Sequence, residues 1–124
     1  MGKFMVKKTK TGIKFNLVAT NGEIIGTSEV YKAKASCLKG IDSVKRNAAA
    51  AGVEDQTVDN FEAVKHPKFE IYKDKAGEFR FRLKAKNGEI ILASEGYVTK
   101  ANCKKGVESV IKNSVDAPIV EEAE

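Results

Sequence analysis

Three cations alternate with apolar residues between positions 79 and 84, and their spacing is the clearest chemical signal in the chain. The segment reads Phe79-Arg80-Phe81-Arg82-Leu83-Lys84. In a β-strand, successive side chains point to opposite faces, so Arg80, Arg82 and Lys84 would share the solvent face. By the same alternation, Tyr72 of a neighbouring segment would join them. Cations with an aromatic ring suit an anionic ligand or single-stranded nucleic acid, and we predict these four residues as a partner-binding site.

A solvated outer face is the alternative interpretation, because antiparallel sheets commonly have one face in water. Counterparts of the three cations in the first half of the chain are Lys14, Asn16 and Val18, an incomplete set. We therefore expect any such site to lie mainly on the second half.

Nucleophilic and metal chemistry lack the necessary residues. Cys37 and Cys103 fall on apolar helical stripes, and we expect them to be buried, reduced packing residues rather than a disulfide. His66 is the only histidine, so a zinc site would lack ligands, and a buried cysteine is a poor nucleophile. We predict no catalytic residue, no metal site and no cofactor.

Repeated glutamates could supply paired carboxylates for acid–base chemistry. They are Glu23 and Glu89, and Glu29 and Glu95. Glutamates beside turns and lysines more often form exposed ion pairs, which is the alternative. Repeated Tyr31 and Tyr97 could likewise be core residues or anchors for a protein partner.

The sequence contains an internal duplication, and the fold of its two copies determines where those side chains lie. The segment from Lys3 to about Asn47 is repeated from Lys68 to about Asn113, at a spacing of about 66 residues. A self-match this dense predicts one supersecondary unit per copy. We expect a single domain over residues 1–124, with repeat one at about 3–58, a linker at about 59–67 and repeat two at about 68–124.

Each copy predicts three antiparallel strands and then a helix. Asn-Gly pairs at 21–22 and 87–88 are strong hairpin signals. Thr99 is a predicted N-cap of the second helix. Gly40 and Gly106 recur in the middle of the helices, where glycine costs about 1 kcal/mol relative to alanine, so we expect each helix to pack closely against the sheet there. A short fourth strand would follow each helix, at 53–58 and 119–122.

These units predict an α+β fold, because a small hairpin sheet with one helix is too small to be stable alone. The two β-β-β-α-β repeats should share one continuous antiparallel sheet, with both helices on one face. A pseudo-twofold axis would then relate the halves, and we expect a monomer, with a homodimer as the alternative.

Several motifs, in order and in both copies, resemble the YegP-like family (DUF1508, UPF0339). The motifs are Lys68-Phe69-Glu70-Ile71-Tyr72-Lys73-Asp74, Asn87-Gly88-Glu89-Ile90-Ile91, Ser94-Glu95-Gly96-Tyr97 and Gly106-Val107-Glu108-Ser109-Val110. The resemblance implies a tandem-repeat form in which the C-terminal strands are exchanged between the halves. The family is named for having no known function, so it assigns no catalytic or binding residue.

Composition limits the function classes further. The chain has 124 residues, a formal net charge of +5 and a pI near 9.2. No apolar run approaches the roughly 20 residues of a membrane helix, and the N-terminus lacks a signal peptide's apolar core, so we expect a cytoplasmic protein without a membrane partner. We predict a non-enzymatic binding or interaction module that uses the basic sheet face for an anionic ligand, nucleic acid or protein. The alternative is an enzyme with a site at the seam between the repeats.

Overall fold

The computed structural model describes residues 2–121, which form eight strands and two helices. In chain order they are β1 (Lys3–Lys8), β2 (Ile13–Val18), β3 (Ile24–Thr27), α1 (Lys34–Ala50), β4 (Gly52–Asp55), β5 (Lys68–Lys73), β6 (Phe79–Lys84), β7 (Ile90–Ala93), α2 (Lys100–Ser114) and β8 (Ile119–Glu121). This order confirms the prediction of three strands, a helix and a short fourth strand in each copy, but β4 ends at Asp55 and the predicted strand residues 56–58 lie in a turn. Predicted strand residue Glu122 and the end of repeat two lie outside the described residues.

All eight strands belong to one sheet, in the order β4-β5-β6-β7-β3-β2-β1-β8. The prediction of a wholly antiparallel sheet is wrong, because β4 runs parallel to β5 and β8 runs parallel to β1. These two strands are the ones that follow a helix, and each pairs with the first strand of the other repeat. The sheet is therefore mixed, with antiparallel pairing in its middle and one parallel pair at each edge.

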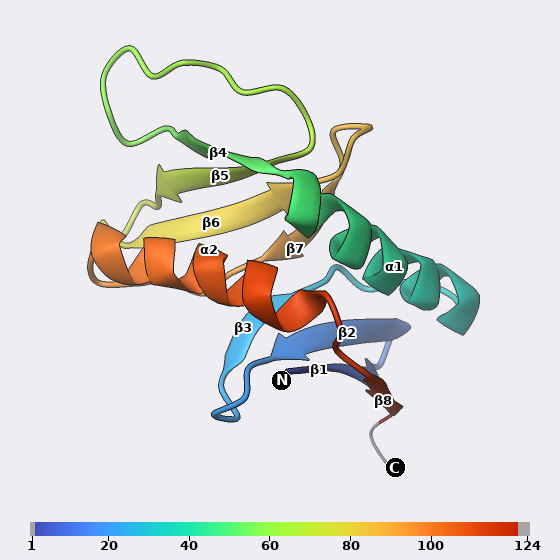
Figure 1. Cartoon of the computed structure of the whole chain (residues 1–124). Helices are drawn as coiled ribbons and strands as arrows, with labels where there is room; N and C mark the ends of the chain where they lie inside the picture. The colour runs from blue at the N-terminus through green and yellow to red at the C-terminus, as the bar shows by residue number, and fades with distance from the viewer. Residues whose placement is uncertain (1, 122–124) are drawn as a thin grey trace.

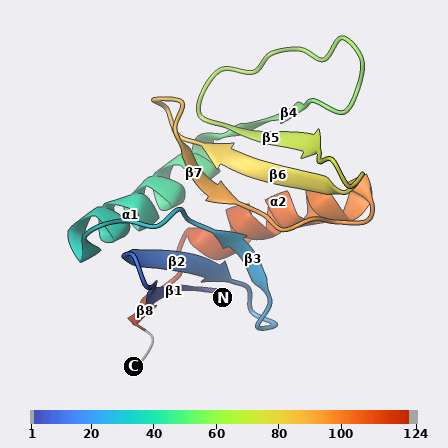
Figure 2. The same ribbon diagram turned by 180° about the vertical axis from the view of Figure 1, so that it is seen from behind.

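Both helices lie on the same side of the sheet (Figure 1). Seen from behind, the strands stand in front of the helices, and no helix covers this second face (Figure 2). We call it the outer face. No helix within residues 2–121 is long and apolar enough to span a membrane.

Alternating side chains build the core between the sheet and the helices. Phe4, Phe15, Phe69 and Phe81 are fully buried there. Phe4 and Phe15 meet edge to face with ring centroids 5.7 Å apart, and Phe69 and Phe81 repeat this contact at 6.0 Å. Such aromatic pairs contribute about 0.5–1.5 kcal/mol beyond the burial of their area.

The two helix glycines make room for tyrosine side chains. A Cβ atom on Gly106 would lie 2.5 Å from the Tyr97 hydroxyl oxygen, and Tyr31 blocks the same position on Gly40. The expectation of close helix packing is thus confirmed, although the neighbour is an aromatic ring rather than sheet backbone. The predicted cap is confirmed as well, because the Thr99 side chain accepts a hydrogen bond from the Asn102 amide.

Candidate functional site

The four predicted site residues lie together on the outer face. Cross-strand pairing sets Tyr72 beside Arg80, and Glu70 beside Arg82, across β5 and β6. Lys68 faces Lys84 in the same register. The alternation of Phe81 and Leu83 into the core, where both are fully buried, is what directs the cations to this face.

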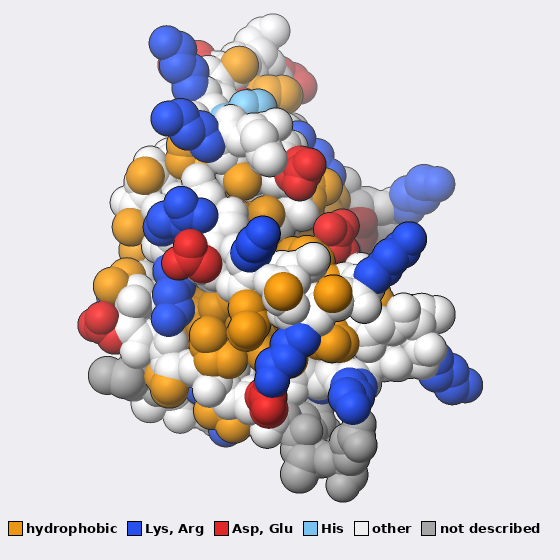
Figure 3. Space-filling model, turned by 90° about the vertical axis from the view of Figure 1, so that its right-hand side faces the viewer, with side chains coloured by type: hydrophobic (Ala, Val, Ile, Leu, Met, Phe, Trp, Pro, Cys, Tyr) orange, Lys and Arg blue, Asp and Glu red, His pale blue; other side chains and the backbone are white. Residues whose placement is uncertain are grey.

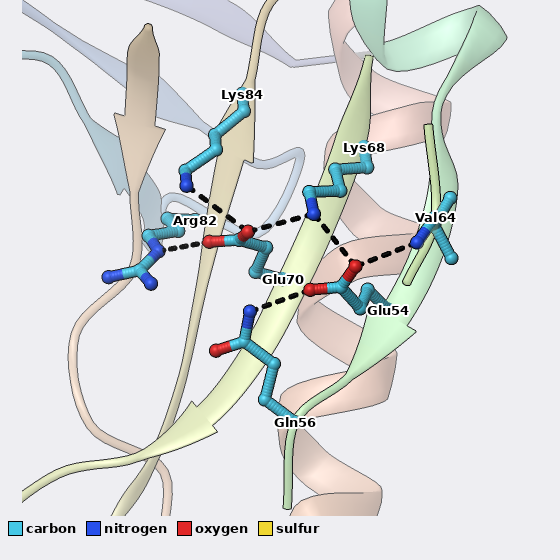
Figure 4. Close-up of polar contacts among 7 residues, drawn as sticks. All are labelled: Glu54, Gln56, Val64, Lys68, Glu70, Arg82 and Lys84. Atoms are coloured by element: carbon cyan, nitrogen blue, oxygen red, sulfur yellow. Dashed lines mark hydrogen bonds and ion pairs between the residues drawn. The ribbon is translucent and has the colours of Figure 1, made fainter. Parts of the chain in front are cut away.

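A buried carboxylate holds the centre of this cationic group (Figure 4). Glu70 Oε1 accepts a hydrogen bond from Arg82 Nε at 2.5 Å. Its Oε2 lies 3.2 Å from both Lys68 Nζ and Lys84 Nζ. The Glu70 side chain is only 3% exposed, since these three cations cover it.

A second buried carboxylate ties the parallel strand β4 to this group. Glu54 Oε2 lies 2.7 Å from Lys68 Nζ and accepts a hydrogen bond from the Val64 amide. Its other oxygen accepts a hydrogen bond from the Gln56 side chain. Glu54 therefore joins the linker, β4 and β5, as Figure 4 shows. We call Glu54, Lys68, Glu70, Arg82 and Lys84 the charged cluster.

Hydrogen bonds and ion pairs keep these acids ionised. The hydrogen bonds from Gln56, Lys68 and Val64 lower the pKa of Glu54 to about 2. Burial acts to raise the pKa of Glu70, but its contacts with Arg82, Lys68 and Lys84 outweigh burial and lower it. The charged cluster carries three positive and two negative charges, so it is largely neutralised from within.

Arg80 and Tyr72, the other two predicted site residues, also contact neighbouring side chains. Arg80 Nε donates a hydrogen bond to Asp74 Oδ2 at 2.7 Å, which lowers the pKa of that carboxyl. The Arg82 guanidinium carbon lies 4.5 Å from the centroid of the Tyr72 ring. The two terminal nitrogens of Arg82 point away from Glu70 (Figure 4) and donate no hydrogen bond to any residue between Gly2 and Glu121.

The first half of the outer face is chemically different. Met5, Asn16 and Thr27 occupy the row that corresponds to Glu70 and Arg82 in the second half. Asn16 accepts a hydrogen bond from the Thr27 hydroxyl instead of forming an ion pair. The outer face thus breaks the pseudo-symmetry that the duplication establishes elsewhere.

Among the hollows at the seam between the repeats are two that we call the first and second seam pockets. The first, of about 200 Å³, is lined by Tyr31, Lys39, Gly40 and Ser43 of repeat one and by Asn87, Glu89 and Ile91 of repeat two. The second, of about 430 Å³, is lined by Tyr97, Lys105, Gly106 and Ser109 of repeat two and by Asn21, Glu23 and Ile25 of repeat one. These named residues are the same types at equivalent positions, with the repeats exchanged, whereas Ser36 of the first pocket corresponds to Asn102 of the second.

The first seam pocket lies where α1 faces the β6–β7 hairpin. A space-filling view of this side of the molecule shows apolar side chains gathered in its middle, with charged side chains of both signs around them (Figure 3). The first seam pocket itself combines the apolar residues Ala85, Ile90 and Ile91 with polar ones such as Lys39 and Glu89, and this mixture is typical of small-molecule sites.

The groups that could serve as nucleophiles are protonated at neutral pH. Burial raises the pKa of Cys37, and raises that of Cys103 to about 11 with the help of nearby Asp55. Both thiols are buried and free, which confirms their prediction as packing residues. No hydrogen bond joins either cysteine to the exposed His66 within residues 2–121, and no group of metal-ligating side chains occurs in that range.

Sequence reasoning missed Glu54 and Lys68 as members of the charged cluster, and its alternative of a site at the seam named none of the residues that line the seam pockets. The parallel register that sets Glu54 beside Glu70 is long-range and leaves no local pattern. The seam pockets did leave a signal, because most of their polar residues are identical in both copies and lie off the apolar stripes. That identity alone could not show which residues of the two copies meet.

Comparison with known protein families settles the relationship of this chain. The family described as a domain of unknown function (DUF1508) matches residues 10–55 and 74–121, which is most of the chain, in two segments. The chain belongs to the DUF1508 family. The predicted resemblance is thereby confirmed, and so is the duplication, because the family matches each repeat once.

Relatives of this DUF1508 protein include both double and single forms. The UPF0339 protein PA0329 of Pseudomonas aeruginosa is 41% identical over 122 residues, covering 98% of this chain and 97% of the relative. A UPF0339 protein of Treponema denticola is 63% identical over 54 residues, which are 44% of this chain but 93% of the relative. The solution NMR structure of the protein of unknown function yegP from E. coli has a TM-score of 0.79 at 32% identity, covering 98% of this chain and 92% of that one.

Proposed function

We propose that this DUF1508 protein is a non-enzymatic binding module whose outer face accepts an anionic macromolecule. The observation that supports this is the charge balance of that face. Among residues 2–121 its cations include Lys3, Lys14, Lys68, Arg80, Arg82 and Lys84, and its carboxylates are Glu54, Glu70 and Asp74. These cations outnumber the carboxylates by three, on a surface that no helix covers.

Single-stranded nucleic acid is the class of partner that we favour. Neighbouring strands of a sheet lie about 4.8 Å apart, so the cations form rows that a phosphate backbone can follow. Glu70 fixes the Arg82 side chain through Nε, which leaves the terminal donors already oriented for a phosphate oxygen. Because the Tyr72 ring is covered by Arg82, backbone contacts rather than base stacking should dominate, and binding should be weakly sequence-specific.

Fluorescence anisotropy with a labelled single-stranded oligonucleotide tests the proposal. If four phosphates are neutralised, the logarithmic salt slope should be about −2.8, which lowers affinity about 50-fold between 50 and 200 mM salt. The variant Lys14→Gln/Arg80→Gln removes a cation at equivalent positions of the two repeats and should flatten this slope. The control Lys104→Gln/Lys112→Gln makes the same charge change on exposed positions of α2 and should leave the slope unchanged. No binding at low salt would reject nucleic acid, and equal effects of both variants would reject the outer face.

An enzyme at the seam is the second candidate, favoured by the concave seam pockets. Burial raises the pKa of Tyr31 and of Tyr97, and neighbouring glutamates raise both further. A group kept protonated in this way is a weak base and a weak nucleophile, which supports binding over catalysis.

We also propose that the edge pairs β4–β5 and β8–β1 represent an exchange of C-terminal strands between the two repeats. The Treponema denticola relative supports this idea, because it matches a single repeat and would need a second copy to form the same sheet. The tandem chain would then be a monomer in the cytoplasm, where free thiols such as Cys37 persist. Light scattering that reports a dimer would contradict the monomer.

A further inference from the structure

The seam pockets hold polar groups that the fold does not use. Asn21 and Asn87 accept hydrogen bonds from the amides of Glu23 and Glu89, which shapes each hairpin. The carboxylates of these glutamates form no ion pair or hydrogen bond with any residue between Gly2 and Glu121. The opposite holds on the outer face, where each carboxylate of the charged cluster is engaged.

Lys39 and Lys105, on the helical wall of each pocket, are likewise unpaired in the part of the chain that the structure describes. Ordinary surface divergence would change such exposed residues independently in two copies of a duplicated chain. Here the asparagine, glutamate, lysine, serine and tyrosine are retained at both pockets. A structural requirement explains the glycine and the tyrosine, but it does not explain the unpaired charges.

The electrostatic character of the pockets indicates the ligand. Burial is the main cause of the raised pKa of Tyr31, and Glu29 of its own repeat and Glu89 of the other repeat raise it further. Tyr97 has the equivalent neighbours Glu95 and Glu23. In the first pocket Glu29, Glu89 and the Tyr31 hydroxyl thus provide oxygen acceptors, and Lys39 and Ser43 of the helix provide donors. In the second pocket Glu23 and Tyr97 provide the acceptors, and Lys105 and Ser109 provide the donors.

We propose that each seam pocket binds a small zwitterion, a free amino acid, with its ammonium at the glutamates and its carboxylate at the helical lysine. An ammonium has three donors, and the two carboxylates and the tyrosyl oxygen of the first pocket can accept all three. The second pocket offers the Glu23 carboxylate and the Tyr97 oxygen. The floor of the first pocket contains Ile91, Ala85 and Gly40, which suits a small aliphatic side chain in about 200 Å³. This proposal is independent of the outer face, since the two sites share no residue.

Titration of the isotope-labelled full chain with L-valine, followed by NMR, tests the proposal. Saturable shifts are expected for the amides of Gly40 and Asn87 at the first pocket, and of Gly106 and Asn21 at the second. Isobutylamine lacks the carboxylate of valine and isovalerate lacks its ammonium. Each should bind at least about tenfold more weakly, because a charge-assisted hydrogen bond contributes about 1.5–3 kcal/mol.

The duplication provides an internal control for the decisive variant. Glu89→Gln should weaken the response of Gly40 and Asn87 about tenfold or more and leave that of Gly106 and Asn21 unchanged. Lys39→Gln should act on the same pocket from its other end. Absence of shifts with L-valine at millimolar concentration would overturn the proposal. Isobutylamine binding as tightly as L-valine, or a Glu89→Gln variant that weakens both pockets equally, would also overturn it.

Discussion

Replacing Glu54 with glutamine should destabilise the protein strongly, because this carboxylate is buried, ionised and joined to three segments. The side chain is only 3% exposed, and its contacts lower its pKa from 4.5 to about 2. Each unit by which folding lowers a pKa corresponds to about 1.4 kcal/mol, so the ionised carboxylate stabilises the fold by about 3 kcal/mol at neutral pH. Breaking one partner of a buried ion pair costs about 3–5 kcal/mol, which agrees with this figure.

The stabilisation that the Glu54 carboxylate provides depends on pH. Because the folded-state pKa is lowered, the stabilisation is fully present above pH 4.5 and is lost as the pH falls towards 2. The difference in unfolding free energy between the wild type and Glu54→Gln should therefore shrink from about 3 kcal/mol at pH 7 to about 1.4 kcal/mol at pH 3.

Urea unfolding followed by far-UV circular dichroism measures this difference at each pH. Asp42→Asn is the matched control, since Asp42 pairs with Arg46 on an exposed helix surface and should contribute at most about 0.5 kcal/mol. Equal unfolding free energies of the wild type and Glu54→Gln at pH 7 would show that the Glu54 carboxylate does not stabilise the fold. A difference in unfolding free energy that does not change down to pH 3 would show that its ionisation is not the cause.

Three other perturbations test the packing. Gly106→Ala should lower the unfolding free energy by about 1 kcal/mol or more, despite the better helix propensity of alanine, because the new Cβ would lie 2.5 Å from the Tyr97 hydroxyl. Adding Tyr97→Phe should restore part of this loss. Urea titration measures both effects, and a Gly106→Ala variant more stable than the wild type would contradict the expected clash. Thr99→Ala should lower the unfolding free energy by about 1 kcal/mol, because it removes the cap of α2. Ala33→Thr, at the uncapped start of α1, should raise the unfolding free energy in the same assay. A more stable Thr99→Ala variant or a less stable Ala33→Thr variant would contradict the assigned caps. Both cysteines should resist a water-soluble disulfide reagent in the native protein at pH 8 and react only in urea, because burial raises their pKa; rapid native labelling of either thiol would refute this.

What the sequence could predict was local. The alternation in 79–84 identified β6 to the residue, and the hydroxyl of Thr99 marked the start of α2. The recurrence of Gly40 and Gly106 pointed to a close packing contact, although the partner could not be named. Each of these features depends on residues near one another in the chain, where steric and hydrogen-bonding preferences act directly.

What the sequence could not predict depends on which distant strands meet. Arg82 and Lys84 read as an open basic face because strand alternation places Glu70 on that face without showing that it pairs with them, and nothing local shows that Glu54 would arrive in a parallel strand. The mixed sheet was missed for the same reason. Register between distant strands is determined by the packing of the whole sheet, and the seam pockets follow from that packing as well.

Mapping a single-stranded oligonucleotide onto the protein by NMR distinguishes binding at the outer face of the sheet from binding elsewhere. If the outer face binds an anionic macromolecule, amide shifts at low salt should concentrate on β1, β2, β5 and β6, and they should disappear as salt is raised. Shifts concentrated on α1 and α2, or no shifts at low salt, would contradict binding at the outer face.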